Sequence, residues 1–480
     1  MTKLVIFDLD GTLLNTVEDL GNATNYALKT LGYPQREIEE YKILCGRGIA
    51  NLLKDALPED ARTDEVRARM ANLFFPYYRE HINDCTVPYD GIIPMLDRLA
   101  AEGIRFALAS NKYQEGAERL IGRFFGKYGF ATILGQREGY PIKPDPAIVD
   151  QILADNPDIS RDEVVYVGDS NVDMMTGNNA RVRTIGVTWG FRSREELAAH
   201  NPWKLIDTPA DLAEAILGPL GDRVERLVRR ASAIMRQKNF EIHTKGGDVA
   251  NLCTSADIGV QHFLYDGLSA LIPGSGFLGE EEDMTDMDHD YVWIVDPIDG
   301  TANFARGIAE CAISVGLKHG GDIVLGIVYN PFREELFRAE KGKGAYLNGK
   351  RIHVSGRSFK ASLFCCALCV YKKEYAQICN DIIMEVYPHC SDVRRFGSAA
   401  LELCYLANGT IELFFEYRLM PWDYAAASLI VEEAGGVLTG RGGSKLIYDR
   451  PLLVVGANTR ENHDKLCSIV TSHTSENPYD

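Results

Sequence analysis

The 480-residue sequence contains no run of about 18 or more uncharged apolar residues, so we expect no membrane-spanning segment. It also lacks an excess of positive charge, because 68 Asp and Glu residues outnumber 51 Lys and Arg residues and leave a formal net charge of −17. Such a chain repels a polyanion, which argues against nucleic acid as the main partner. The first ten residues lack the basic, apolar and small-residue plan of an export signal, so we expect a cytoplasmic protein.

Regular cysteine pairing is also missing. The eleven cysteines are spread along the chain, which in a cytoplasmic protein predicts reduced thiols and no disulfide framework. Cys366 and Cys369 have the spacing of half a zinc site, but no second pair follows at a suitable distance, and the flanking residues indicate a strand. We therefore expect these two residues to be buried strand cysteines.

The sequence does contain two patterns of secondary structure, and its length predicts two or three domains. Over residues 1 to about 215, short apolar strands alternate with amphipathic helices, which predicts an α/β domain with a parallel sheet. Residues 17–85 follow a purely helical pattern and predict a small helical insert. Residues 218–221, with the sequence Gly-Pro-Leu-Gly, break the helical pattern and predict a short linker. The second half becomes rich in strands, which predicts mixed sheets packed with helices.

Two aspartates stand at the end of the first predicted strand, in the segment "VIFDLDGT". Asp8 and Asp10 are two residues apart, so both side chains lie on the same side of an extended chain. Parallel sheets place their ligand chemistry beyond the carboxyl ends of the strands. Later segments of this half offer a hydroxyl, a lysine and two further acids for the same edge: Ser110, Lys143, Asp169 and Asp173. A metal ion and a lysine balance the charge of a phosphoryl group, and a carboxylate can attack it.

With these four motifs in order, residues 1–217 resemble the haloacid dehalogenase-like phosphatases, and among them the phosphoglycolate phosphatase-like group. The resemblance implies a Rossmann-like domain with a small helical cap at about residues 17–85. It implies that Asp8 forms a phospho-aspartyl intermediate and that Asp10 acts as general acid and base. By the same resemblance, the phosphate is bound by Ser110, Asn111 and Lys143. One Mg²⁺ is held by Asp8, Asp169 and the main chain at Asp10, with Asp173 binding the ion or orienting its waters. Asn15 departs from the family pattern, where Asp is frequent.

A second group of acids lies among apolar residues in the other half: Glu280 in "FLGEEED", Asp296 and Asp299 in "DPIDGT", and Asp423 in "MPWDYAAA". Buried unpaired carboxylates are costly, so this group predicts bound cations, and oxygen-only ligands favour Mg²⁺ over zinc. A bend at Pro297 would let Asp296 and Asp299 both face inward and bridge two ions about 4 Å apart. If a helix starts after Gly300, the backbone N–H groups of Gly300 and Thr301 favour phosphate.

Residues 222–472 resemble the inositol monophosphatase family through "NLCTSAD", "GEE", "DPIDGTANF" and "WDYAAA". The resemblance implies a layered α/β sandwich and a lithium-sensitive, Mg²⁺-dependent phosphatase. It implies two or three Mg²⁺ ions, held by Glu280, Asp296, Asp299, Asp423 and the carbonyl of Ile298. Thr301, with Asp257 behind it and Glu280 nearby, would position and activate the attacking water.

The same resemblance implies where a substrate binds. Gly300, Thr301, Gly397 and Ser398 would line the phosphate pocket, and Glu416 would bind sugar or inositol hydroxyls. Glu416 is equally consistent with a solvated strand residue. Asn251 stands where some members carry Asp, and Lys245 and Asp248 lie in a Gly-rich loop that either closes over the site or is a plain surface loop.

Together these patterns predict a bifunctional phosphomonoesterase that acts on small phosphorylated metabolites. The N-terminal half would hydrolyse a phosphoglycolate-like ester, and the C-terminal half an inositol or sugar monophosphate. Relatives with the same metal motif cleave fructose 1,6-bisphosphate, nucleotide 3′-phosphates or histidinol phosphate, so these substrates stay open. A different hypothesis is that one half is a non-catalytic regulatory module. Family analogy also suggests a homodimer formed through the C-terminal domain.

Overall fold

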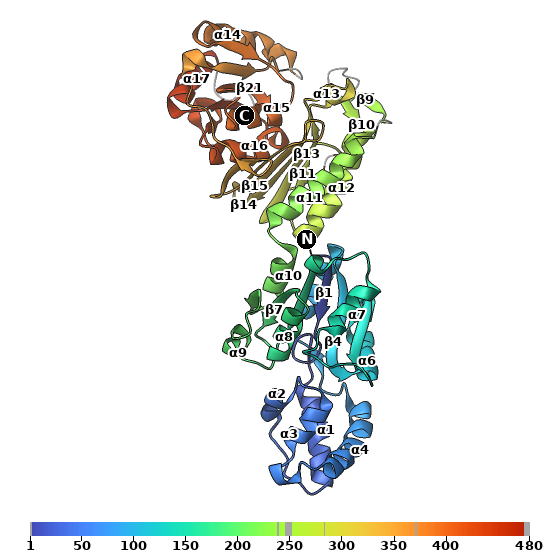
Figure 1. The fold of residues 1–480 in the computed structure, drawn as a ribbon. Helices are drawn as coiled ribbons and strands as arrows, with labels where there is room; N and C mark the ends of the chain where they lie inside the picture. Colours follow the sequence, from blue (N-terminus) through green and yellow to red (C-terminus); the bar gives the residue numbers. More distant parts are fainter. Residues whose placement is uncertain (1, 238–239, 245–251, 283, 370–371, 475–480) are drawn as a thin grey trace. The chain divides into compact units, whose positions relative to one another are not determined.

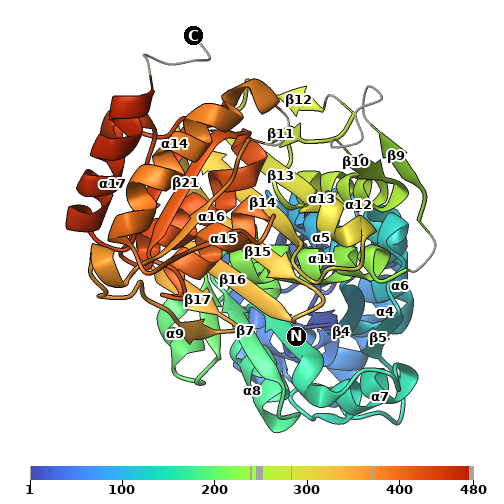
Figure 2. The ribbon, with the colours of Figure 1, turned by 90° about the horizontal axis from the view of Figure 1, so that it is seen from above.

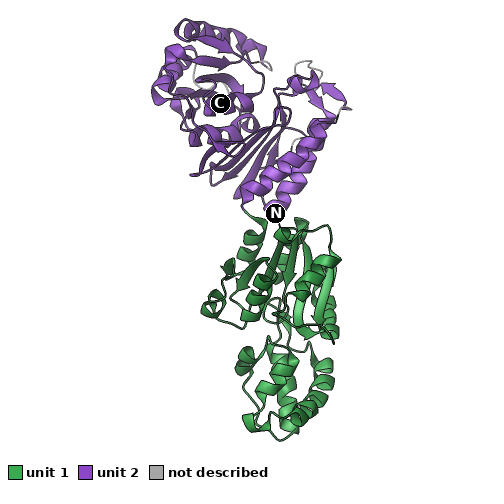
Figure 3. Cartoon of the chain, in the orientation of Figure 1, with its two compact units in different colours: residues 1–218 green, residues 219–480 purple. Residues whose placement is uncertain are grey.

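The structure of the chain is a computed structural model that describes residues 2–237, 240–244, 252–282, 284–369 and 372–474. The chain divides into two compact units, Met1–Gly218 and Pro219–Asp480 (Figure 3). Lys245, Asp248 and Asn251, which drew attention in the sequence, lie outside the described residues.

Unit 1 is built on a six-stranded parallel sheet with the order β5-β4-β1-β6-β7-β8 (Figure 1). Its strands are β1 (Leu4–Phe7), β4 (Arg105–Tyr113), β5 (Thr132–Gln136), β6 (Val164–Gly168), β7 (Arg183–Val187) and β8 (Lys204–Ile206). Alternate residues of β1 enter two different cores. Val5 and Phe7 pack in the core that includes α5 (Ile92–Ala101), α6 (Gln114–Phe125) and α10 (Pro209–Leu217), whereas Leu4 and Ile6 pack in the core that includes α7 (Ala147–Asp155). Burial on both faces explains why this strand is apolar throughout.

A helical cap is inserted between two short linker strands of unit 1. β2 (Leu14–Asn15) leads into the cap and pairs antiparallel with β3 (Val87–Pro88), which leads out of it. The cap contains α1 (Val17–Thr30), α2 (Tyr41–Leu44), α3 (Ile49–Ala56) and α4 (Asp64–His81). On α4 the buried residues Met70, Phe74 and Tyr78 recur every four residues, which places them on one helical face.

Unit 2 contains a large and a small sheet (Figure 2). The large sheet has the order β12-β11-β13-β14-β15-β16-β17-β18, and the small one β20-β19-β21-β23-β22. The large sheet comprises β11 (Gly276–Gly279), β12 (Thr285–Asp286), β13 (Tyr291–Asp299), β14 (Ala312–His319), β15 (Asp322–Asn330), β16 (Glu335–Glu340), β17 (Gly344–Leu347) and β18 (Lys350–Arg351). The small sheet comprises β19 (Leu363–Cys366), β20 (Asp392–Arg394), β21 (Leu413–Leu419), β22 (Val437–Thr439) and β23 (Leu452–Ala457). β9 (Ile242–Thr244) and β10 (Leu252–Thr254) form a separate antiparallel pair.

Three hydrophobic cores hold the layers of unit 2 together. α11 (Leu220–Met235) and α12 (Ser255–Leu271) pack with one face of the large sheet. α15 (Ala399–Ala407) and α16 (Pro421–Glu433) share a core with both sheets, and α14 (Ala376–Val386) and α17 (Arg460–His473) pack with the small sheet. These helix and sheet layers confirm the predicted layered α/β architecture. Within the described ranges, no helix is both long and apolar enough to cross a bilayer.

The structure corrects one detail of the cysteine prediction. Cys366 ends strand β19, but Cys369 lies beyond the strand, in a left-handed backbone conformation with a φ of 53°. Both side chains are buried, and all eleven cysteines are free thiols. In the part of the chain that the structure describes, the groups of side chains that could hold a metal ion contain only aspartates.

Candidate active sites

The first site lies at the carboxyl edge of the sheet in unit 1. Asp8 directly follows β1, Ser110 lies near the end of β4, and Asp169 directly follows β6. Asp173 lies in the first turn of α8 (Asn171–Asn179), where it completes a capping box with Ser170. Parallel pairing of β4, β1 and β6 therefore brings residues more than 150 positions apart to one edge.

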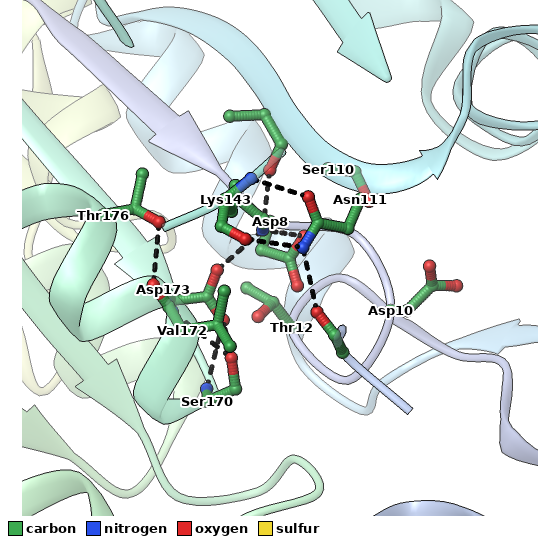
Figure 4. A network of polar contacts seen from close by, with 12 residues as sticks. Asp8, Asp10, Thr12, Ser110, Asn111, Lys143, Ser170, Val172, Asp173 and Thr176 are labelled. Atoms are coloured by element: carbon green, nitrogen blue, oxygen red, sulfur yellow. Dashed lines mark hydrogen bonds and ion pairs between the residues drawn. The ribbon is translucent and has the colours of Figure 1, made fainter. Parts of the chain in front are cut away.

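Lys143 joins two of these acids (Figure 4). Its Nζ donates to Asp8 Oδ1 and to Asp173 Oδ1, each at 2.7 Å, and to the carbonyl of Ala109 at 3.0 Å. Burial lowers the pKa of Lys143, but Asp173 and Asp8 outweigh it and hold this pKa well above its usual value. Burial, and next Asp173, raises the pKa of Asp8, while Lys143 lowers it. A charged ammonium therefore stands beside the predicted nucleophile.

Asp169 is held from two sides. The Thr12 hydroxyl donates to its Oδ1 at 3.0 Å, and the backbone N–H of Phe191 donates to its Oδ2 at 2.7 Å. Burial and the charge of Asp173 raise the pKa of Asp169 to about 7. Ionisation of a carboxyl group with this pKa is unfavourable unless a positive charge lies nearby.

The donor set fits a divalent cation. Asp8, Asp169 and Asp173 each offer a carboxylate oxygen, and the three oxygens lie within 4.8 Å of one another. Asp173 is the most occupied of the three, because its Oδ1 accepts from Lys143 and Tyr166 and its Oδ2 accepts from Ser170. Asp8 and Asp169 therefore have more capacity left for direct ligation than Asp173.

The remaining predicted residues of this site face the cap. Asp10 Oδ1 accepts from the Nζ of Lys112 at 2.9 Å. The Asn111 side chain bonds to the backbone of two other segments. Its Oδ1 accepts from the N–H of Lys143, and its Nδ2 donates to the carbonyls of Lys143 and Gly46. A cavity is lined by Asp8, Asp10, Ser110, Asn111 and Lys112 from the core and by Leu20, Cys45, Gly46, Gly48, Ile49 and Leu52 from the cap. The Asn111 side chain is thus already bonded to protein, and its role toward phosphate stays a prediction.

The second site is built on a β-bulge in unit 2. Along β13, the pairing with β14 shifts register between Asp296, opposite Ser314, and Asp299, opposite Ala312. Three residue steps on β13 thus lie opposite two on β14. The side chains of Asp296 and Asp299 therefore do not follow the usual alternation between the two faces of the sheet. Pro297 lies inside the bulge. Because proline has no backbone N–H, the break in the ladder costs no hydrogen bond from this residue. Asp423 comes from the first turn of α16, and one oxygen of each of the three acids lies within 4.8 Å of the others.

Backbone and hydroxyl donors fix these three carboxylates. Asp296 Oδ1 accepts from the N–H of Ile298 at 2.9 Å, and Asp423 Oδ2 accepts from the N–H of Met420 at 2.7 Å. Asp299 Oδ2 accepts from the Ser398 hydroxyl and from the N–H of Ala400, at 2.5 and 2.8 Å. The cluster thus presents carboxylate oxygens from three aspartates, held by backbone N–H groups and a serine hydroxyl. That set fits Mg²⁺.

Burial raises the pKa values of this acid cluster, and repulsion between the acids adds to the effect. Burial, and next Glu280, raises the pKa of Asp296 well above its usual value. Burial raises the pKa of Asp299 to about 7, and burial with Asp299 and Glu280 raises that of Asp423. Glu280 is thus close enough to act on the cluster electrostatically, although it is not among the three acids whose oxygens converge within 4.8 Å.

A hydroxyl and a further carboxylate stand beside the cluster. Thr301 Oγ1 lies 3.1 Å from Asp257 Oδ1 and 3.0 Å from the carbonyl of Ile298. Asp257 is anchored at the start of α12 in a capping box with Thr254. Burial raises the pKa of Asp257 to about 7, with further contributions from Glu280 and Glu281. A base with a pKa near neutrality suits proton abstraction. The helix after Gly300, α13 (Thr301–Ala305), has only five residues.

Glu402 is a residue of the second site that the sequence did not single out. It is fully buried on α15, and its Oε1 accepts from the N–H groups of Phe396 and Gly397 at 2.6 and 2.8 Å. Glu402 thereby fixes the backbone of the predicted phosphate loop, and the Ser398 hydroxyl is turned to Asp299. Burial, and next Glu402, raises the pKa of the half-buried Glu416 on β21. A sequence signal existed, because Glu402 interrupts an apolar run in "SAALELCYLA".

Comparison with known proteins agrees with this geometry. The family described as the inositol monophosphatase family matches residues 220–475, just over half of the chain, and the family described as haloacid dehalogenase-like hydrolase matches residues 5–187. An inositol-1-monophosphatase of Mesorhizobium japonicum is 36% identical over 222 residues, which cover 46% of this chain and 82% of that protein. The Nus factor SuhB of Escherichia coli K12 is 34% identical over 229 residues, which cover 46% and 85%.

A solved structure is also similar to part of this chain. A Lactobacillus delbrueckii subsp. bulgaricus protein assigned as a phosphoglycolate phosphatase is 33% identical, covers 46% of this chain and 100% of its own, and has a TM-score of 0.43. Both matched families are hydrolases of the phosphatase type that generally use Mg²⁺ and act on small phosphorylated substrates. The chain therefore belongs to the inositol monophosphatase family through its C-terminal half and is fused to a haloacid dehalogenase-like hydrolase domain in its N-terminal half.

Proposed function

We propose that this chain is a bifunctional Mg²⁺-dependent phosphomonoesterase with two independent active sites. Residues 1–217 hydrolyse a small, phosphoglycolate-like ester, and residues 222–472 hydrolyse an inositol or sugar monophosphate. The observation that carries the proposal is that each unit has its own cluster of aspartates, Asp8-Asp169-Asp173 in one and Asp296-Asp299-Asp423 in the other, and that all of them are buried except the half-buried Asp423. Two further acids that the proposed chemistry needs lie beside these clusters: Asp10 lines the same cavity as Asp8, and Glu280 acts on Asp296 electrostatically.

In the N-terminal site, Mg²⁺ bound by Asp8, Asp169 and the main chain at Asp10 would neutralise phosphate charge, with one ion in the site. Asp8 attacks phosphorus through the oxygen that Lys143 leaves open, and the ester oxygen departs with a proton from Asp10. Water then attacks the phospho-aspartate, gives its proton to Asp10, and releases Asp8. Lys143 and the Ser110 hydroxyl bind the phosphoryl oxygens throughout.

In the C-terminal site, two or three Mg²⁺ ions held by Glu280, Asp296, the carbonyl of Ile298, Asp299 and Asp423 would supply Lewis acidity and lower the pKa of bound water. Thr301 orients the attacking water. Its hydroxyl accepts from that water and donates to Asp257, which takes up the proton. The main chain at Gly300, Thr301, Gly397 and Ser398 borders the phosphate position, and Glu416 accepts from substrate hydroxyls.

The test is a phosphate-release screen over a metabolite panel with the full-length chain. Asp8→Asn removes one set of activities by at least about a hundredfold and leaves the other set, and Asp296→Asn does the reverse. Loss of every activity in either variant, or of none, contradicts two independent sites. The screen also decides among fructose 1,6-bisphosphate, a nucleotide 3′-phosphate and histidinol phosphate as substrates of the C-terminal half.

A regulatory role for one half predicts a different result. One of the two substitutions would then leave every hydrolytic activity in place, yet change the kcat or KM of the other half. Measuring both constants for each variant separates the two hypotheses.

A further inference from the structure

Lys112 is a buried cation of the N-terminal site that the mechanism above does not use. It follows Asn111 near the end of β4, and only 1% of its side chain is exposed. Its Nζ donates to Asp10 Oδ1 at 2.9 Å and to the Tyr78 hydroxyl at 2.6 Å, and lies 4.9 Å from the centre of the Tyr78 ring. A buried ammonium is costly unless it is paired, so these two partners define its position.

The three residues come from three segments of unit 1. Asp10 belongs to the loop after β1, Lys112 to a strand of the core, and Tyr78 to helix α4 of the cap. Tyr78 is fully buried and stacks on Phe74, with ring centres 5.1 Å apart, so the cap itself holds its ring in place. The position of the Tyr78 hydroxyl, and with it the hydrogen bond to Lys112, therefore depends on the position of the cap.

The contact with Asp10 restricts the carboxylate that the proposed mechanism uses for proton transfer. Lys112 binds Oδ1, which fixes the direction of Oδ2 as well, because both oxygens lie in one plane on a short side chain. Asp10 and Lys112 both line the cavity that also contains Asp8 and Ser110.

We propose that Lys112 and Tyr78 are positioning residues for Asp10, through which the helical cap aims the carboxylate at the leaving-group oxygen. This rests on the phospho-aspartyl function proposed for residues 1–217. When the Asp8–phosphorus bond forms and the ester bond breaks, the proton of Asp10 passes to the departing oxygen, and the Lys112 ammonium pairs with the carboxylate left behind. When water attacks, its proton returns to Asp10 and the Asp8–phosphorus bond breaks.

The experiment uses leaving groups that differ in their need for a proton. An alkyl phosphate releases an alkoxide that must be protonated, whereas para-nitrophenyl phosphate releases a stable phenolate. The rate is taken as the part that Asp8→Asn abolishes, in the full-length chain with Mg²⁺. In Tyr78→Phe and Lys112→Met, we expect kcat/KM for the alkyl ester to fall about a hundredfold and that for the aryl ester to fall less than about fivefold, because general acid catalysis contributes about 10² to 10⁴. The KM for the alkyl ester should stay within about twofold.

Matched controls separate positioning from packing. Tyr77→Phe alters the neighbouring cap residue, whose ring stacks on Tyr26 at 4.3 Å, and Lys127→Met removes an exposed lysine paired with Asp97. Both should keep the kinetics of the parent chain. If Lys112→Met fails to fold, Tyr78→Phe still decides, because it removes one oxygen and keeps the ring.

Equal losses on both esters, or no loss in Tyr78→Phe, overturn the positioning role. If no ester depends on Asp8, the proposed function fails instead, and the two failures are thereby distinguished.

Discussion

Gly11 lies where the N-terminal site leaves no room for a side chain. Its φ of 93° is in the left-handed region, and a Cβ built on it would lie 2.3 Å from Asp169 Oδ2. Because this Cβ would clash with the Asp169 carboxylate, we expect Gly11→Ala to displace Asp169 from its hydrogen bonds with Thr12 and the backbone of Phe191. Asp8-dependent hydrolysis should fall by about a hundredfold or more, since misplacement by about 1 Å has effects of this size. Steady-state kinetics measure it.

Gly32 offers the matched control for this substitution. It has a similar φ of 81°, at the end of α1, but a Cβ there meets no atom within 4 Å. Gly32→Ala should therefore cost only the conformational penalty of about 1–2 kcal/mol in the free energy of unfolding and leave the kinetics unchanged. Equal activity in the two variants would show that Asp169 does not need its present position.

Thr301 allows a comparable test of the C-terminal site. Thr301→Val keeps the shape of the side chain but removes the hydroxyl that joins the proposed water to Asp257. The kcat of the Asp296-dependent activity should fall about a hundredfold, whereas Thr301→Ser, which keeps the hydroxyl, should retain it within about fivefold. A serine variant as impaired as the valine variant would indicate a packing role for the methyl group.

At the scale of secondary-structure elements, the two linkers of the cap depend on Asp19. This residue lies in the first turn of α1 and is 2% exposed. Its carboxylate accepts from the N–H of Cys85 at 2.9 Å and from the N–H and hydroxyl of Thr86 at 2.8 and 2.7 Å. Asp19 thus joins the strand pair β2–β3 to the start of the cap.

We expect Asp19→Asn to weaken these linkers, because an amide group must then face backbone donors. Loss of charge-assisted hydrogen bonds of this kind costs about 1.5–3 kcal/mol. Hydrogen exchange at Cys85 and Thr86, followed by mass spectrometry, should lose protection. Glu65→Gln, at an exposed position in the first turn of α4, is the control. Unchanged exchange in Asp19→Asn would contradict the role of this carboxylate.

The elements also show what the sequence could predict. The acids at the ends of β1 and β6 were predictable, because parallel strands deliver their carboxyl ends to one edge whatever lies between them. The inward turn of Asp296 and Asp299 was predictable from Pro297, and a register shift in β13 produces it. These features depend on local geometry that the sequence carries.

Contacts between distant elements were not predictable in the same way. Lys112 directly follows Ser110 and Asn111 in the sequence, yet nothing local indicates that the hydroxyl of a cap tyrosine 34 residues earlier lies 2.6 Å from its Nζ. The family resemblance implies that Asn111 binds phosphate, which stays a prediction, and it does not indicate that the side chain also contacts the backbones of Gly46 and Lys143. Such pairings depend on how the cap meets the core, and hydrophobic periodicity does not encode that.

At the scale of the whole molecule, both units contain carboxylates whose charge is unfavourable without cations. Burial raises the pKa values of Asp169, Asp257 and Asp299 to about 7, and unfolded aspartates titrate near 3.9. Between these values the folded chain binds more protons than the unfolded chain. Without metal, the free energy of unfolding should therefore fall as the pH rises from about 4 to about 7 and stay low above that range.

The fall of the free energy of unfolding with rising pH determines how Mg²⁺ should change the stability of the chain. Ionised carboxylates are the form that binds a cation, so Mg²⁺ should raise the melting temperature more at pH 8 than at pH 5.5. At a free concentration of 100 times Kd the gain is about 2.7 kcal/mol per site. Calorimetry in EDTA and in Mg²⁺, at equal ionic strength, measures it. Asp299→Asn should raise the melting temperature in EDTA and shrink the response of unit 2 to Mg²⁺, because it removes a repelling charge together with a proposed ligand. If Mg²⁺ stabilised the parent chain equally at both pH values, the binding would not require the ionised clusters.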